Sequence, residues 1–278
     1  MSYIKILGGG EPQVIKDLAF YTLLKGILPP EEKEFSLLFK EMDGEVRTED
    51  ARITREAMSN VHGDWYEWLL AIAAWNCFVR NKDSHLAILM PNVIQFDVAT
   101  LYEKRLTDLL ADLKRKVAEV SHVQLITSNP DFVIINGDLA RETMGQVSEI
   151  ENFTSDTLKM LEGIYQNFIG RCNFEQIEGY ISVKTSLRPD RRLQISHEGS
   201  LMKALYAHLQ TREWITSPKG LKYYAISTKI NKPDRNALKT VATHSLTTVF
   251  SLPQAAVDEV FEVNTLRQAS QAFSSILC

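Results

Sequence analysis

The chain of 278 residues is 45% hydrophobic and carries a formal net charge of −4 at pH 7. This length is enough to bury one large core or two smaller ones, and the slightly acidic balance excludes a general binder of polyanions. Any contact with nucleic acid must therefore come from a local basic patch. The three cysteines lie far apart and in no Cys-x-x-Cys spacing, which predicts reduced thiols rather than a zinc cluster.

The N-terminus does not have the pattern of a targeting segment. Its first residues, MSYIKILGGG, lack the basic start and the apolar run of a signal peptide. The longest apolar run, over 68–75, is far shorter than the roughly 20 residues that cross a bilayer. We therefore expect a cytoplasmic protein with no membrane contact.

The first half of the chain is predicted to be mostly helical. Pro29-Pro30 ends one helix and opens the next, and Gly63-Asp64 indicates the start of a strongly apolar helix. Apolar residues at three- and four-residue steps indicate a long amphipathic helix later in this half. The predicted elements are helices over 12–28, 31–42, 47–60, 64–80 and 98–120, with a strand at 86–90.

The second half mixes short strands with helices. The predicted strands cover 123–127, 132–135, 180–187, 222–228 and 246–252, the helices cover 155–169 and 197–213, and a helical pair covers 254–273. Because helices and strands mix without strict alternation, we expect an α/β fold with a central mixed sheet flanked by helices. No linker rich in Pro, Gly or Ser interrupts the chain, so we expect a single domain over 1–278, in which a helical N-terminal extension (1–62) precedes the core (63–278).

An acid and a lysine stand beside strands that are predicted to be buried. Asp131 directly precedes FVII, and an ionised carboxylate there is costly unless a cation pairs with it. The alternative is an ordinary turn aspartate at a strand end. Lys184 lies in the β-branched run YISVKTSL, although lysine is rarely buried. It could equally belong to the solvated face of an edge strand.

Two glutamates are predicted to point inward from helices. Glu198 shares a helix face with leucines that follow at steps of three, four and four, although an acid in the first turn also gains from the helix dipole. Glu67 lies in DWYEWLLAIAAWNCFVR, a helix that is apolar on nearly every side. It therefore lies in the interior or at a cleft, unless it is exposed by chance at a helix end.

These groups match the needs of metal-assisted phosphodiester hydrolysis. Carboxylates hold Mg²⁺ while water and phosphate oxygens complete its coordination. The metal lowers the pKa of a bound water and neutralises charge on the transition state. A lysine beside the attacking water can orient it and offset the developing charge.

A basic cluster begins at Lys184 and extends to Arg192, with Asp190 as its only acid. Pro189 excludes the α conformation at the residue before it, so we expect an exposed loop. Arginine fits the O6 and N7 acceptors of guanine bidentately, and aspartate accepts from the N4 amino group of cytosine. The cluster is therefore suited to read G·C pairs, while the alternative is a turn where charge is free to sit. Its cations are Lys184, Arg188, Arg191 and Arg192.

The order Asp131, Lys184 and then Glu198 fourteen positions later resembles the rearranged active site of PD-(D/E)XK restriction endonucleases. The usual second acid would stand at Ser182, and the subgroup that cuts CCGG supplies it from the following helix. The Arg-x-Asp-Arg motif of that subgroup matches Arg188, Asp190 and Arg191, and GDWYEWL matches its helix with a buried active-site acid, at Glu67. The resemblance covers most of the chain after residue 60 and is closest to the RCCGGY-cutting type II enzymes, BsrFI and its isoschizomers.

This resemblance implies a restriction endonuclease-like fold and Mg²⁺-dependent cleavage of double-stranded DNA at R/CCGGY, leaving four-base 5′ overhangs. It implies that Asp131, Glu198 and the main-chain carbonyl of Val183 hold the metal and that Lys184 stands at the water. Glu67 would be a second acid beside them. A palindromic site implies a homodimer, and the relatives imply a homotetramer built from two dimers. We expect Trp214, after the helix over 197–213, to contact the other dimer unless it packs in the core.

Two other functions remain open from the sequence alone. One is a non-catalytic, sequence-specific DNA-binding protein, in which the acids are structural. The other is a metal-dependent phosphoesterase for a small substrate, which gives the arginine cluster no role. How the outer R·Y pair is read, whether one or two metals act and what residues 1–60 do also stay open; the turn Met90-Pro91-Asn92 is a candidate for the outer pair.

Overall fold

A five-stranded mixed sheet forms the centre of the protein in the computed structural model, which describes residues 2–91, 96–122, 125, 129–246 and 253–278. The strand order is β3-β4-β5-β6-β7, with antiparallel pairing from β3 to β5 and parallel pairing from β5 to β7. The predicted mixed sheet is confirmed. The strands are β3 (Leu86–Leu89), β4 (Phe132–Ile135), β5 (Ile177–Lys184), β6 (Lys222–Ser227) and β7 (Glu259–Glu262).

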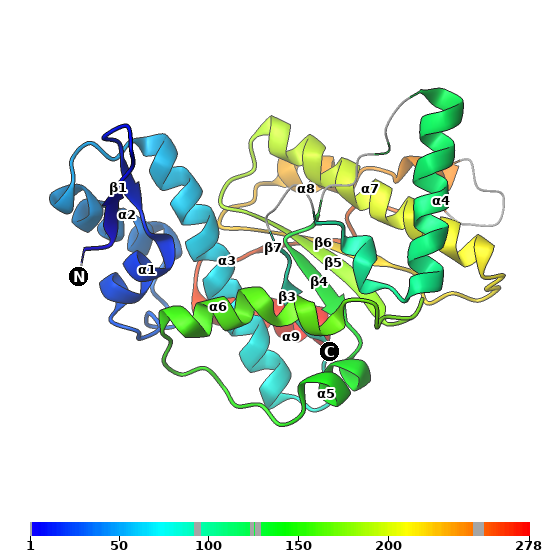
Figure 1. The fold of residues 1–278 in the computed structure, drawn as a ribbon, viewed down its shortest axis with the longest axis horizontal. Helices are drawn as coiled ribbons and strands as arrows, with labels where there is room; N and C mark the ends of the chain where they lie inside the picture. The colour runs from blue at the N-terminus through cyan, green and yellow to red at the C-terminus, as the bar shows by residue number, and fades with distance from the viewer. Residues whose placement is uncertain (1, 92–95, 123–124, 126–128, 247–252) are drawn as a thin grey trace.

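Helices cover both faces of this sheet (Figure 1). On one face, α3 (Arg55–Arg80) contacts β3, and α9 (Leu266–Leu277) places Phe273 against Phe132 of β4. On the other face, α7 (Pro189–Arg212) packs on β6, and α4 (Lys104–Ser121) and α8 (Lys232–Leu238) pack on α7. Side chains alternate along a strand, so Tyr180, Ser182 and Lys184 of β5 share the face that α7 covers.

The N-terminal part lies beside α3, at the left of Figure 1. Its two short strands form an antiparallel pair, and Phe20 packs against Trp65 and Trp68 of α3. One cluster of buried apolar residues runs from Tyr3 to Leu277. The remaining elements are β1 (Ile4–Ile6), β2 (Pro12–Val14), α1 (Lys16–Leu24), α2 (Phe35–Glu49), α5 (Gly137–Met144), α6 (Ser155–Gly163) and the 3-10 helices η1 (Val98–Leu101), η2 (Ile164–Phe168) and η3 (Thr243–Leu246).

The predicted break before residue 64 is wrong. A single helix, α3, runs from Arg55, and Thr54 caps it by accepting a hydrogen bond from the amide of Ala57. Gly63 is therefore a helix-interior residue, because the buried residues Met58, Val61 and Trp65 extend one apolar stripe through it. Upstream, the helices predicted over 12–28 and 31–42 are shifted: β2 occupies 12–14, and α2 begins only at Phe35.

The predicted loop at residues 188–191 is also wrong. Arg188 is the N-cap residue of α7, and Pro189 is its first helical residue, where a missing N–H and a fixed φ are favourable. The helix thus begins eight residues earlier than the predicted start at 197. Glu198 lies in its third turn, so the helix dipole does not explain that acid.

Further differences lie at element ends. The first half of the helical pair predicted over 254–273 is strand β7, and the predicted helix over 98–120 begins as η1 before α4. The sequence analysis missed α5 and α8, the latter opened by a capping box between Asn231 and Asp234. Apart from Leu125 and Leu246, the strands predicted at 123–127 and 246–252 lie outside the described residues. Within the described ranges, no helix combines the length and the apolar character needed to span a bilayer.

Candidate active site

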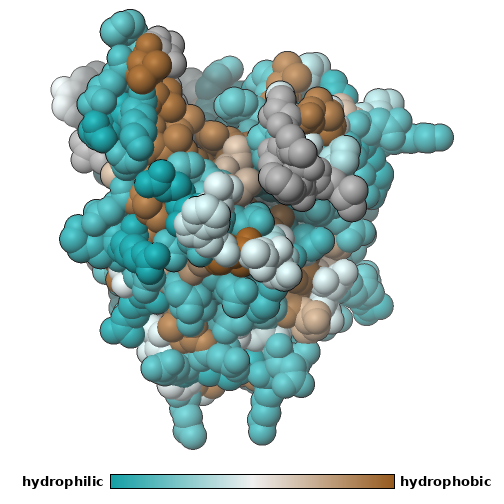
Figure 2. Space-filling view, turned by 90° about the vertical axis from the view of Figure 1, so that its right-hand side faces the viewer, coloured by the Kyte–Doolittle hydropathy of each residue, from teal (hydrophilic) through white to brown (hydrophobic). Residues whose placement is uncertain are grey.

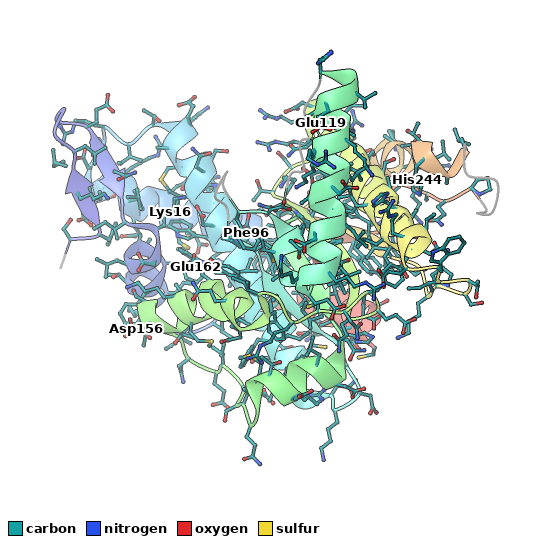
Figure 3. The ribbon with its side chains drawn as sticks, turned by 45° about the vertical axis from the view of Figure 1, so that its right-hand side comes forward. Lys16, Phe96, Glu119, Asp156, Glu162 and His244 are labelled. Atoms are coloured by element: carbon teal, nitrogen blue, oxygen red, sulfur yellow. The ribbon has the colours of Figure 1, made fainter. Side chains whose placement is uncertain are left out.

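An open cleft of about 660 Å³ lies at the carboxyl end of β5. Its walls come from α3, the start of α7 and the segment before β4, and Lys16 of α1 lies at its rim. Figure 3 shows Lys16 on the N-terminal side of this region, with Glu119 high on α4 on the other side. The charged residues that line the cleft are Lys16, Asp64, Glu67, Asp131, Lys184, Arg188, Arg191 and Glu198.

Asp131 and Lys184 form an ion pair at the floor of this cleft. Asp131 directly precedes β4 and Lys184 ends β5, and the antiparallel pairing of these strands brings the two side chains together. The Nζ atom of Lys184 lies 3.0 Å from Oδ2 and 3.3 Å from Oδ1 of Asp131. The same carboxylate accepts hydrogen bonds from the amide of Val183 and, at 3.3 Å, from Oγ of Ser182.

Lys184 stays a cation in this setting. Burial lowers the pKa of Lys184, but Asp131, and more weakly Glu198 and Glu67, favour the charged form and leave that pKa above its ordinary value. The lysine is therefore neither a solvated edge residue nor a neutral amine. It lies within electrostatic reach of three carboxylates.

Glu198 is buried, as its position on the apolar stripe predicts, with 3% of its surface exposed. Oε1 accepts from Nε2 of Gln194 at 2.9 Å, and Oε2 accepts from the hydroxyl of Tyr223 at 3.0 Å. Burial, followed by Glu198 and Asp131, raises the pKa of Tyr223 well above its ordinary value, so the hydroxyl keeps its proton. Gly199 permits this contact, because a Cβ there would lie 2.2 Å from the carbonyl oxygen of Ala256.

Glu67 lies at the side of the cleft, half-buried on α3. Burial raises the pKa of Glu67 well above its ordinary value, and the charge of Asp131 raises it further. One turn earlier on α3, Asp64 pairs with Lys16 at the rim. The cleft thus brings four acidic side chains together with four cations, of which Lys184 and Lys16 pair with Asp131 and Asp64.

The donor set fits a hard divalent cation. Asp131 and Glu198 offer carboxylate oxygens, and Mg²⁺ is commonly held by one or two carboxylates, with water and phosphate completing the shell. In the described part of the chain, no group of three His, Cys, Asp or Glu residues comes close enough to hold a metal alone. Burial, followed by the charge of Asp131, raises the pKa of Glu67, and a cation bound nearby would favour the ionised form of this acid.

The basic cluster divides between the cleft and the fold. Arg188 and Arg191 line the cleft, and the exposed Asp190 lies 3.3 Å from Nη2 of Arg188 and 3.9 Å from Nε of Arg191. Arg192 instead pairs at 2.9 Å with Asp234, a buried residue of α8. Of these residues, only Arg188, Asp190 and Arg191 are therefore open to an external partner.

Three further predicted residues can be located. Trp214 follows α7 with φ 56° and is 89% exposed, which excludes the packed-core alternative. Met90 and Pro91 line the cleft, whereas Asn92 lies outside the described residues.

The sequence analysis missed several residues of the site. Lys16 belongs to the N-terminal part, and its position at the rim depends on long-range packing of α1 on α3. Gln194 lies one helical turn before Glu198, a spacing that could have found it once the true start of α7 was known. Tyr223 gives no local signal, because it reaches Glu198 only through the packing of α7 on β6.

Comparisons with known proteins agree along the whole chain. Residues 33–278 match the family model described as Cfr10I/Bse634I restriction endonuclease. The type II restriction enzyme Cfr10I of Citrobacter freundii is 39% identical over 284 residues, which cover 100% of this chain and 99% of that enzyme. A structure of the Bse634I restriction endonuclease aligns with a TM-score of 0.86 at 31% identity, covering 98% of this chain and 96% of that one. A structure of the Type IIF restriction endonuclease Bse634I with cognate DNA aligns with a TM-score of 0.86 at 30% identity, covering 99% and 97%.

The fold and these similarities define a type II restriction endonuclease, an enzyme that cleaves DNA at specific sites. Within that class, the chain belongs to the Cfr10I/Bse634I family. Restriction endonucleases generally depend on a divalent metal ion, which agrees with the oxygen donors of the cleft. Family membership argues against the two alternatives, a non-catalytic DNA-binding protein and a phosphoesterase for small substrates.

Proposed function

We propose that this enzyme is the nuclease of a cytoplasmic restriction–modification system and cuts double-stranded DNA at R/CCGGY, leaving four-base 5′ overhangs. Its sequence resembles the BsrFI-like subgroup, which cuts this site. The observation that carries the proposal is the ion pair between Lys184 and Asp131, which shares one cleft with Glu198 and with the guanidinium groups of Arg188 and Arg191. Chemistry and base reading would then occur in the same cleft.

Four charged groups of the cleft have a role in this mechanism. Asp131 and Glu198, together with the carbonyl of Val183, would hold Mg²⁺, whose chemistry when bound would be to acidify a water and to offset charge on the scissile phosphate. Lys184 donates a hydrogen bond to the attacking water and orients it toward phosphorus. Glu67 is an additional acid near these ligands that can hold a second ion or a metal-bound water.

Recognition depends on the first turn of α7. Arg188 and Arg191 donate bidentately to guanine, and Asp190 accepts from the N4 amino group of cytosine. In the free protein these three residues pair with one another at exposed positions, and such pairs contribute little and break readily on binding. The rigid helix start reduces the ordering cost of binding compared with a flexible loop. Met90-Pro91-Asn92 is the candidate segment for the outer R·Y pair.

A palindromic site requires a two-fold symmetric homodimer, and we propose that two dimers associate into a homotetramer. The exposed indole of Trp214 supports a contact between dimers, because tryptophan is enriched among the few side chains that dominate binding energy at interfaces. The surface seen from the α4 side is mostly hydrophilic, with apolar residues gathered in places (Figure 2). We also propose that 1–278 is a single domain, supported by the continuous apolar cluster.

Plasmid DNA carrying one RCCGGY site tests the proposal directly. The full-length enzyme is incubated with the plasmid in Mg²⁺ or in EDTA, the products are separated on a gel, and the fragment ends are sequenced. Linear DNA only with Mg²⁺, ending in CCGG 5′ overhangs after R, supports the proposal. Ends at another sequence reject the assigned site, and cutting in EDTA rejects the metal-dependent mechanism.

A further inference from the structure

A buried tyrosine donates a hydrogen bond to one of the carboxylates of the cleft. The hydroxyl of Tyr223 on β6 donates to Oε2 of Glu198 at 3.0 Å. Ser182 in turn lies 3.3 Å from Oδ2 of Asp131. Each of these two hydroxyls therefore donates to one carboxylate of the cleft, Ser182 to Asp131 and Tyr223 to Glu198. The proposed mechanism gives neither hydroxyl a role.

Packing holds the tyrosine ring rigidly in this place. Its side chain is 0% exposed, and its amide donates to Oδ2 of Asp258 at 2.7 Å. The amide of Asp258 donates back to the carbonyl of Tyr223 at 2.8 Å. A Cβ on Gly199 would lie only 3.0 Å from Cδ1 of Tyr223, so α7 approaches the ring as closely as a glycine allows.

Such a contact matters most for an acid that comes from a helix. A glutamate has more rotatable bonds than an aspartate, and Glu198 must reach toward Asp131 from a separate element. Gln194 holds one carboxylate oxygen at 2.9 Å and Tyr223 holds the other, so both oxygens have a fixed direction. Hydrogen bonds to metal-binding carboxylates orient them and tune their affinity for the metal.

We propose that Tyr223 is a positioning residue whose hydroxyl orients Glu198 for divalent metal binding. The serine at position 182 is small enough to leave room for the phenol, and its own hydroxyl donates to Asp131. The inference rests on the proposed role of Glu198 as a metal ligand. In this arrangement β6 supplies no metal ligand itself, but its Tyr223 orients Glu198, the ligand that α7 supplies.

Tyr223→Phe removes only the hydroxyl and keeps the ring that packs against Gly199. Tyr224→Phe is the matched control, because the next residue on β6 points to the opposite face and packs against Phe261. Ca²⁺ is titrated calorimetrically into each full-length protein, and cleavage is measured against Mg²⁺ concentration. We expect Tyr223→Phe to weaken Ca²⁺ binding by roughly 10- to 100-fold and to raise the half-saturating Mg²⁺ concentration, with Tyr224→Phe unchanged.

Further measurements separate positioning from general stability. Binding of an RCCGGY duplex in EDTA should match wild type, since neither the base-reading residues nor the fold is altered. In a Glu198→Gln background, Tyr223→Phe should cost no additional Ca²⁺ affinity, because the tyrosine acts through that glutamate. An undiminished loss in that background overturns the inference, and so does equal Ca²⁺ affinity of wild type and Tyr223→Phe. If the wild type fails to cut RCCGGY but Tyr223→Phe still loses Ca²⁺ affinity, the proposed DNA site fails and the positioning role stands.

Discussion

Two neighbouring arginines at the start of α7 should respond in opposite ways to replacement by alanine. Arg192 lies 2.9 Å from Asp234, and the side-chain exposures of the pair are 24% and 7%. Arg192→Ala leaves the Asp234 carboxylate buried, with the amide of Asn231 as a remaining donor at 3.0 Å. The cost should lie between those of an exposed and a fully buried pair, at about 2 kcal/mol of unfolding free energy. For a chain of this size, that corresponds to a fall in melting temperature of roughly 4–8 °C.

Arg191 should show the reverse pattern. Its guanidinium lines the cleft, and its Nε lies 3.9 Å from the exposed Asp190, so the folded state loses little when it is removed. Arg191→Ala should change the unfolding free energy by less than about 0.5 kcal/mol. Binding to an RCCGGY duplex should weaken by ~1–3 kcal/mol, or roughly 5- to 150-fold.

Thermal unfolding and duplex binding in EDTA, measured on both variants, decide the matter. The two variants serve as each other's controls, since they remove the same side chain from adjacent positions. A large loss of duplex affinity in Arg192→Ala without loss of stability would show that the base-reading residues are misassigned. Loss of stability in Arg191→Ala with normal binding would show the same.

Further predictions concern catalysis, packing and pH. Lys184→Ala should abolish cleavage yet retain duplex binding, as a gel assay and a mobility shift can measure; cutting at the wild-type rate would remove its catalytic role. Gly199→Ala should cost ~1–3 kcal/mol or more of unfolding free energy, because its Cβ would lie 2.2 Å from a backbone oxygen. Gly44→Ala has open space around it and should stabilise α2 by about 0.5–1 kcal/mol. Equal melting temperatures of the two variants would contradict this packing. Burial, followed by the charge of Arg212, lowers the pKa of His208 in the folded protein. As the pH drops through about 6.5, His208 therefore takes up a proton more readily in the unfolded chain than in the folded one, and the unfolding free energy falls. His208→Gln should flatten this decline in melting temperature between pH 7.5 and 5.5, and a decline as steep as that of the wild type would exclude the histidine as its cause.

The sequence predicted strands β3, β4 and β6 better than the helix starts, although β7 fell in a segment predicted as helix. FVII at 132–135 is a buried strand with the predicted bounds, because four apolar residues between turn signals leave little choice. The start of α7 was missed because Pro189 disfavours helix only for the residue before it and is itself favourable as the first helical residue. The start of α3 was missed because Gly63 is a weak helix breaker that tertiary packing overrides. Each error placed a boundary inside a continuous helix.

The composition of the cleft was predictable only in part. Asp131, Lys184, Glu198 and Glu67 were all found because each is a charged residue in an apolar context, and all four line one cleft. Lys16, Gln194 and Tyr223 carry no such contrast, since a lysine, a glutamine and a tyrosine are ordinary residues for their elements. Their contributions arise from contacts between elements, which local patterns do not encode.

The unbroken course of α3 has a mechanical consequence for the enzyme. The helix packs with the N-terminal strands and helices, while Glu67 on the same helix lines the cleft. A continuous helix moves largely as one rigid body. A displacement of the first sixty residues would therefore also displace the carboxylate of Glu67. Truncated or chimeric versions of the N-terminal part should therefore keep α3 whole and place their boundary at Asn81, where the helix ends, rather than at residue 62.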